Sequence, residues 1–316
     1  MARHEVLIDK EANAYNIAEA RQMREELRSW REETRQSQLK ASRDESAEQL
    51  GAVKSWLGVD ESDQLAIINP LVSEGDKYPG TCSWLSKDKS IQSFLQRQPS
   101  MPLLWLQGIP GSGKTVLFSQ LVRFMDAADF PIIQYFCSHS FASSLTYDDI
   151  LRSLVLKLVQ RHPDLISYVH SNMVMSKKNP TRTVLQKLVH ELVIMSSQVT
   201  SKDEYLWILV DGIDECAEDH QQTLVETLRR MMKAAKPTGT TIKVLISSRQ
   251  TSTLAQLLKK SHVVSLSARK PEVDGAIGLY ASQRLLAMSA RLDGIEVTSA
   301  SRRTIEKCVV DKSAGE

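Results

Sequence analysis

Residues 108–115 read GIPGSGKT and directly follow the apolar run LLWL at 103–106. The octapeptide fits the pattern G-x-x-x-x-G-K-[ST], which is typical of loops that bind the phosphates of a nucleotide. Its glycines let the chain bend until several backbone N–H groups point at one place. An apolar strand before the loop and an apolar helix after it are the context that this pattern requires. Nucleotide binding is therefore the first hypothesis for the chain.

The residues of the loop have different expected roles. Pro110 has no N–H group, so the backbone donors must come from residues 111–115. We expect the Lys114 ammonium to contact the β- and γ-phosphates and the Thr115 hydroxyl to reach Mg²⁺. A helix that begins near Lys114 adds the positive end of its dipole. The predicted nucleotide-binding residues of the loop are Gly108, Pro110, Gly111, Ser112, Gly113, Lys114 and Thr115.

The composition of the chain excludes few classes of function. The 316 residues are 42% hydrophobic and 25% charged with a net charge of +2, which gives no indication of a nucleic-acid surface. The length allows one large α/β domain with smaller attachments. No signal peptide and no membrane-spanning apolar run is visible, so we expect a cytoplasmic protein without a membrane partner. Four scattered cysteines without a C-x-x-C pair disfavour zinc ligation and a disulfide framework.

The first 100 residues divide at Gly51. Residues 9–50 contain no Pro or Gly and favour a charged helix whose narrow apolar stripe includes Met23, Leu27 and Trp30. This helix has two interpretations, a solvated helix leaning on the main domain, which we favour, or a coiled-coil arm for a partner. In residues 51–100, Gly and Pro predict breaks between short helices. Those breaks are expected at Gly51, Gly58, Pro70, Gly75, Pro79 and Gly80.

Strands and amphipathic helices alternate through the rest of the chain, which predicts an α/β fold with a five-stranded, mainly parallel sheet. Thr146 is expected to cap one of these helices. We divide the chain into an N-terminal charged helix (1–50), a helical entry segment (51–100), a P-loop NTPase core (101–268) and the start of a helical lid (269–316). The expected strands are 103–108, 131–137, 205–211, 241–247 and 262–267.

An acidic loop follows the most apolar of these strands. The strand LWILV at 206–210 ends in DGIDE at 211–215. Open α/β sheets bind ligands at the carboxyl ends of their strands, so Asp211 is the expected Mg²⁺ partner opposite Thr115. Asp214 or Glu215 could orient and deprotonate the water that attacks the γ-phosphate. The residues alone do not choose between these two carboxylates.

The fourth strand ends in a candidate phosphate sensor. IKVLISSR at 242–249 places Arg249 just beyond the carboxyl end of a buried strand. A guanidinium at that place could pair with the γ-phosphate and report its presence. Arg249 therefore joins Asp214 and Glu215 as a predicted catalytic residue.

Taken in order, GIPGSGKT, LWILVDGIDE and KVLISSR resemble the NACHT domain of STAND-class signalling NTPases, closest to the fungal NLR-like type also called nephrocystin-3-like N-terminal. GTCSWL at 80–85 and QYFCS at 134–138 fit the same pattern, and the resemblance spans about 53–280. It implies ATP, less often GTP, bound to a five-stranded core, with Gly80 and Thr81 near the base and Arg249 as sensor. It also implies slow hydrolysis as an off/on signalling switch, self-association in the on state and an effector protein of unknown identity.

Two departures bear on function. Gly212 follows Asp211 directly, where many related ATPases carry a catalytic glutamate, which agrees with slow turnover. The segment from Asp274 to Leu292 resembles the beginning of the family's helical lid, and the sequence ends at Glu316 without the winged helix that follows in the family. A non-hydrolysing nucleotide-binding scaffold or adaptor, working through the helix at 1–50, therefore stays open as an alternative. The expected self-association involves the NTPase core or residues 1–50. Ras-like GTPases and transporter ATPases fit less well because N-K-x-D and LSGGQ-like segments are absent.

Overall fold

The computed structural model describes residues 2–98, 101–199, 205–294 and 297–313. Its centre is one five-stranded parallel sheet with strand order β2-β3-β4-β1-β5. All five predicted strands are present within two residues of the expected ends, so the predicted fold class is confirmed. The strands are β1 (Leu103–Gln107), β2 (Ile132–Phe136), β3 (Tyr205–Asp211), β4 (Thr241–Ser248) and β5 (His262–Ser265).

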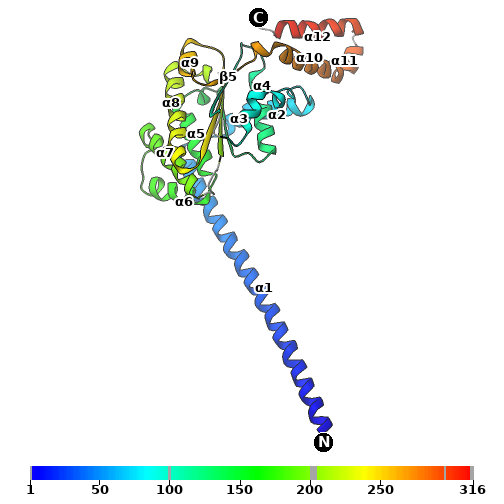
Figure 1. Ribbon diagram of the computed structural model, residues 1–316, viewed down its shortest axis with the longest axis vertical. Coiled ribbons are helices and arrows are strands. Elements are labelled where there is room, and N and C mark those ends of the chain that lie inside the picture. The colour runs from blue at the N-terminus through cyan, green and yellow to red at the C-terminus, as the bar shows by residue number, and fades with distance from the viewer. Residues whose placement is uncertain (1, 99–100, 200–204, 295–296, 314–316) are drawn as a thin grey trace.

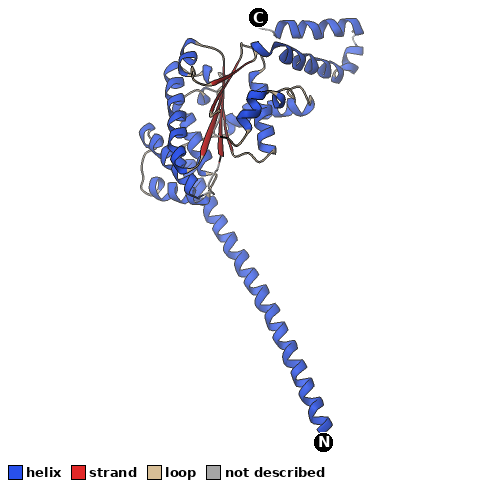
Figure 2. Cartoon of the chain, in the orientation of Figure 1, coloured by secondary structure: helices blue, strands red, loops and turns tan. Residues whose placement is uncertain are grey.

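Helices cover both faces of the sheet (Figures 1 and 2). The body is preceded by a long helix, and a group of three helices follows the last strand. Within the described residues, none of these helices combines the length and apolar composition needed to cross a membrane. The helices are α1 (Ala2–Leu57), α2 (Ser62–Lys77), α3 (Lys89–Leu95), α4 (Lys114–Ala127), α5 (Tyr147–Val159), α6 (Pro163–Val169), α7 (Arg182–Val199), α8 (Glu218–Ala235), α9 (Ser252–Leu257), α10 (Lys270–Ala287), α11 (Ser289–Gly294) and α12 (Ser299–Ser313).

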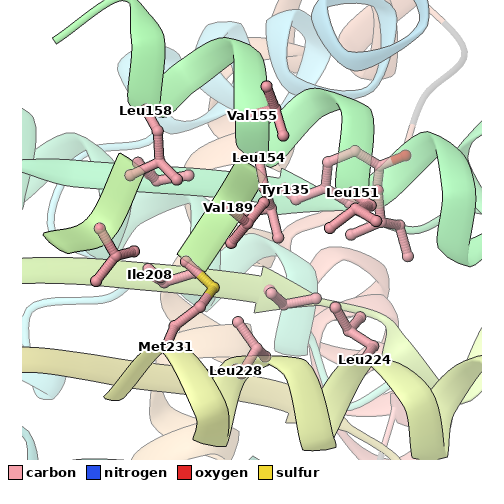
Figure 3. Packing of buried hydrophobic residues seen from close by; sticks show 14 of the residues in the cluster. Tyr135, Leu151, Leu154, Val155, Leu158, Val189, Ile208, Leu224, Leu228 and Met231 are labelled. Carbon is pink, nitrogen blue, oxygen red and sulfur yellow. The ribbon is translucent and has the colours of Figure 1, made fainter. Parts of the chain in front are cut away.

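Alternate residues of each strand face two separate hydrophobic cores, as the period of a strand requires. In β3, Ile208 belongs to the core beneath α5, α7 and α8, while Trp207 belongs to the core beneath α3 and α4. Figure 3 shows part of the first core, in which Leu151 and Leu154 of α5, Ile208 of β3 and Leu228 of α8 belong to one cluster. Because both faces are buried, the central strands read as continuous apolar runs rather than alternating ones.

The predicted break at Gly51 is wrong, because α1 continues through it to Leu57. A helical glycine costs about 1 kcal/mol relative to alanine, and packing of the last turns offsets that cost. Val53 and Leu57 are completely buried, and the Trp56 indole N–H donates to the Lys178 carbonyl at 2.6 Å. The breaks expected at Pro70 and Gly75 are wrong as well, since α2 runs through both.

The favoured interpretation of residues 9–50 is also wrong. From Met23 to Glu48 the described side chains of α1 are exposed or half-buried, and this part of the helix projects away from the body (Figure 1). Near Gln49 the helix meets the body, where the Ser167 hydroxyl of α6 donates to the Gln49 amide oxygen at 2.8 Å. The helix is therefore an arm and does not lean on the domain.

A buried lysine joins the sheet to α3. Lys243 of β4 is 0% exposed, and its ammonium donates to the carbonyls of Phe94 at 2.9 Å and Gln96 at 2.6 Å, with a longer contact to Ser93 at 3.4 Å. The last carbonyls of a helix have no partner within the helix. Lys243 therefore caps α3 from a neighbouring strand, while burial lowers the pKa of its ammonium to about 8.

Replacing Lys243 with Met keeps the aliphatic stem and leaves the carbonyls at the end of α3 without their donor. An unsatisfied buried acceptor costs about 1–3 kcal/mol, so we expect Lys243→Met to lower the free energy of unfolding by about that amount. Urea denaturation measures it, with Lys233→Met on the exposed side of α8 as the control. Equal stability of the two variants would contradict the capping role.

Candidate nucleotide-binding site

Pairing of the parallel strands brings the predicted motifs to one edge of the sheet. In the register, Gln107 at the end of β1 lies opposite Ser248 of β4, and Asp211 at the end of β3 lies opposite Ser247. β4 is thus the only strand between the glycine loop and the acidic loop. This is a topological switch point, where open α/β sheets bind ligands.

The glycine loop is held in a bent conformation by its own contacts. Gly111 and Gly113 have φ of +73° and +75°, the left-handed region that glycine adopts without strain. The Gly108 N–H donates to the Ser248 carbonyl at 3.3 Å, which fixes the start of the loop to β4. The Ser112 hydroxyl donates to the Ile109 carbonyl at 2.8 Å and closes a turn. Helix α4 begins at Lys114. Its first N–H groups have no partner within the helix and are therefore available at the glycine loop.

Lys114 lies beside the acidic loop. Its ammonium donates to the Ile109 carbonyl at 2.8 Å. Burial lowers the pKa of this ammonium, and the carboxylates of Asp214, Asp211 and Glu215 act in the opposite direction. The lysine and these three carboxylates are therefore close enough to interact, although about 100 residues separate them in the sequence.

Asp211 has the properties of a metal ligand. Its side chain is 2% exposed, and its Oδ1 atom is buried with no hydrogen-bond partner. Burial raises the pKa of this carboxyl to about 6, opposed by the hydroxyls of Ser247 and Thr115 and by the charge of Lys114. A buried carboxylate oxygen without a donor is costly, and a cation beside it would remove that cost. Thr115 and Asp211 are thus brought together as the sequence predicts.

The described residues contain no group of three or more His, Cys, Asp and Glu side chains placed to hold a metal ion by themselves. In nucleotide sites Mg²⁺ binds one or two protein oxygens and takes its other ligands from phosphates and water. The Asp211 carboxylate and the Thr115 hydroxyl are two such oxygen donors at this place. The residues present therefore fit a magnesium ion that arrives with a nucleotide.

Asp214 and Glu215 have different partners. Asp214 is 4% exposed at its side chain and accepts from Arg249 twice, from the backbone N–H at 3.1 Å and from the guanidinium Nε. This carboxylate raises the pKa of Arg249. Glu215 is 30% exposed and accepts from the His139 backbone N–H at 2.5 Å, with the His139 imidazole Nε2 at 3.9 Å. Asp214 holds the arginine, whereas Glu215 stays open to solvent.

Gly212 fixes the turn between these acidic residues. Its φ is +69°, and a Cβ atom there would lie 2.6 Å from the Cys137 carbonyl oxygen. The Gly212 N–H donates to the Ser247 carbonyl at 2.9 Å. The glycine that follows Asp211 is therefore required by the close approach of Cys137, the residue after β2.

A cavity of about 450 Å³ connects these parts. The glycine loop forms one wall, and the acidic loop with Arg249 forms the other. His139, at the end of the loop after β2, also lines it, and the motifs gave no signal for this residue beyond its place next to QYFCS. The lining residues are Pro110, Gly111, Gly113, Lys114, Thr115, Val116, His139, Asp211, Gly212, Asp214, Glu215 and Arg249.

A second cavity of about 370 Å³ adjoins the other side of the glycine loop. Thr81 lines it, whereas Gly80 lines a neighbouring open groove. Its remaining walls come mainly from apolar side chains of α2, α4 and α10. The sequence motifs did not predict Tyr78 and Tyr280, whose rings meet edge to face at 5.0 Å between their centroids. A flat heteroaromatic ring is the kind of group that such a cavity accommodates.

Known proteins resemble this chain in the same region. The family described as Nephrocystin 3, N-terminal matches residues 80–249. The chain belongs to this family. The match begins at the loop that contains Thr81 and ends at Arg249, so it includes both the glycine loop and the acidic loop of the candidate site. The expected resemblance to a NACHT domain of the nephrocystin-3-like type is confirmed.

One similar protein is the Vegetative incompatibility protein HET-E-1 of Podospora anserina, 25% identical over 196 residues. The match covers 58% of this chain and 14% of that protein, so the chain spans a small part of its relative's length. Two solved structures are distant neighbours. A DNA replication initiation factor has a TM-score of 0.34 at 10% identity, covering 71% of this chain and 54% of the other. A chain of the E. coli MS115-1 HORMA:CdnC:Trip13 complex has 0.33 at 17%, covering 83% and 76%.

Proposed function

We propose that this family member binds ATP together with Mg²⁺ and hydrolyses it slowly, and that the bound nucleotide acts as a signalling switch. The observation that carries the proposal is the convergence of Lys114, Asp211, Glu215 and Arg249 on one cavity at the carboxyl end of the sheet. The cytoplasm supplies ATP and Mg²⁺ and is the proposed location. GTP is the other nucleotide that the same phosphate contacts would accept.

The residues of the loop would bind the triphosphate. The N–H groups of Gly111 to Thr115 would donate to phosphate oxygens, and Lys114 would exchange the Ile109 carbonyl for phosphate oxygens. Thr115 and Asp211 would hold Mg²⁺, which would neutralise part of the charge of the phosphates. The base would enter the second cavity, beside Thr81 and next to the contacting rings of Tyr78 and Tyr280.

The acidic loop would divide its work between two carboxylates. Glu215 is the proposed general base, because it faces the cavity and only one of its oxygens is held by His139. Asp214 is a positioning residue, because it holds Arg249 until the γ-phosphate competes for the guanidinium. Exchange of that partner would make Arg249 sensitive to the presence of the γ-phosphate.

A non-hydrolysing scaffold is the second candidate. Arg249 and Glu215 both have protein partners in this structure, Asp214 and the His139 N–H. If those contacts persist when ATP is bound, the site binds nucleotide without turning it over. The scaffold would have the same proposed partners as the switch. These are an effector protein, or a second copy of this chain that binds at the NTPase core.

ATP binding tests the shared part of both candidates. Removing the Lys114 ammonium deletes a charge-assisted hydrogen bond, for which about 1.5–3 kcal/mol is typical. We therefore expect Lys114→Ala to weaken Mg·ATP binding by about 10- to 100-fold in calorimetric titration. Lys233→Ala, on the exposed side of α8, is the control and should bind as the wild type does. Unchanged affinity in Lys114→Ala would contradict the site.

Turnover of Glu215→Gln separates the two candidates. The amide keeps an oxygen that accepts from His139 but cannot take a proton from water. A general base contributes about 10²- to 10⁴-fold to rate, so we expect a loss of that size in kcat with ATP affinity within about threefold. Asp214→Asn is the matched variant, which should change affinity for ATP relative to ADP through Arg249. If the wild type binds ATP without hydrolysing it, the scaffold is the candidate that stands. Full turnover in Glu215→Gln would refute Glu215 as the general base.

A further inference from the structure

The arm of α1 presents large apolar side chains to solvent. Met23 is 58% exposed, Leu27 48% and Trp30 62%. This part of the helix lies outside the body (Figure 1), and none of these three residues belongs to either hydrophobic core or to the residues packed against the cores. A helix that is surrounded by solvent is expected to carry polar side chains on all sides, which these three residues are not. Their clustering within two turns suggests a surface that another helix covers.

These residues belong to a regular heptad pattern. Counting from Ala20, the small and apolar positions recur at alternating spacings of three and four, the seam of a two-stranded coiled coil. Leu27 occupies an a position, and Met23 and Trp30 occupy d positions. Thr34 and Ser37 continue the pattern with small polar residues. The full seam is Ala20, Met23, Leu27, Trp30, Thr34, Ser37 and Ala41.

The charges beside this seam favour a second copy in parallel orientation. In the same register the g positions are Glu19, Glu26 and Glu33, and the e positions include Arg24 and Arg31. In a parallel pair, each g residue faces the e residue of the next heptad on the other helix. Glu19 would then meet Arg24 of the second copy. Glu26 would likewise meet its Arg31.

An antiparallel pair would have the opposite effect. There g positions face g positions and e positions face e positions, which would set glutamates against glutamates and arginines against arginines. Like charges in contact are destabilising. The charge pattern is therefore complementary to the same segment of this chain in one orientation only.

We propose that residues 19–41 of α1 form a parallel two-stranded coiled coil with the same residues of a second copy of this chain. The seam buries Met23, Leu27 and Trp30 from both copies, and the flanking Glu and Arg residues set the orientation. Because both helices run in the same direction, the two bodies lie at the same end of the pair. Each body is then close to its partner at all concentrations at which the arms are paired.

Sedimentation of the full chain without nucleotide tests the seam. The wild type should have twice the mass of one chain, and Leu27→Glu/Trp30→Glu should halve it. Leu39→Glu is the matched control, since Leu39 is 49% exposed on the same helix but lies outside the seam. A monomeric wild type at micromolar concentration would overturn the proposal, because the arm would then await a different partner. So would a dimer that persists in the double variant.

Charge exchange and crosslinking test the orientation. Arg24→Glu/Arg31→Glu should be monomeric, and adding Glu19→Arg/Glu26→Arg to the same chain should restore the dimer. In a Cys308→Ser background, Ser37→Cys at a d position should crosslink between copies with diamide as oxidant, whereas Ser42→Cys outside the seam should not. Absent restoration, or equal crosslinking at both positions, would overturn the parallel pair. These results do not depend on ATP, so they leave the proposed function unaffected.

Discussion

The site depends on the hydrogen-bonded register of β4 with its two neighbours. β4 pairs with β1 on one side and with β3 on the other. The last residues of β1 and β3, Gln107 and Asp211, therefore lie beside the last two residues of β4, Ser248 and Ser247. A slip of one residue in either ladder would turn every side chain of a strand to the opposite face. After such a slip in β1, Leu104 and Leu106 would face the hydrophobic core that contains Trp105 instead of their own. The burial of both faces therefore fixes the distance between the glycine loop and Asp211.

Much of this could be predicted from sequence because the signals are local. A strand that is buried on both faces reads as an apolar run, and the loop at 108–115 needs glycines at fixed positions for its backbone. Thr146 caps α5 as predicted, accepting from the Asp149 N–H at 3.2 Å. Asp211 could be singled out because it directly follows a buried strand, at the edge where open α/β sheets bind ligands.

The remaining features depend on contacts between distant segments. Gly51 reads as a helix end, and only the burial of Val53 and Leu57 against the body shows why the helix continues. Lys243 reads as an ordinary strand residue because its partners are on α3, about 150 positions away. The second cavity combines α2, α4 and α10, and no spacing within one segment specifies that assembly. The sequence left Asp214 and Glu215 equivalent, whereas their partners distinguish them.

Each charged group at the cavity has a protein partner that a nucleotide could replace. Lys114 donates to the Ile109 carbonyl, and Arg249 donates to Asp214. Glu215 accepts from the His139 N–H. In the proposed function, a triphosphate would compete for Lys114 and Arg249, and the attacking water would compete for Glu215. This exchange of partners would give the site two states with different loop contacts, which is the physical requirement for a switch. Asp211 is the exception, because its Oδ1 atom has no partner to lose.

That unpartnered oxygen gives the most direct test of the account. Calorimetric titration of ATP into the wild type and into Asp211→Asn, each with Mg²⁺ and with a chelator, measures how far the metal strengthens ATP binding through this residue. We expect Mg²⁺ to tighten ATP binding at least tenfold in the wild type and to have little effect in Asp211→Asn. An equal effect of Mg²⁺ in both proteins, or no ATP binding by the wild type, would refute the proposed magnesium nucleotide site.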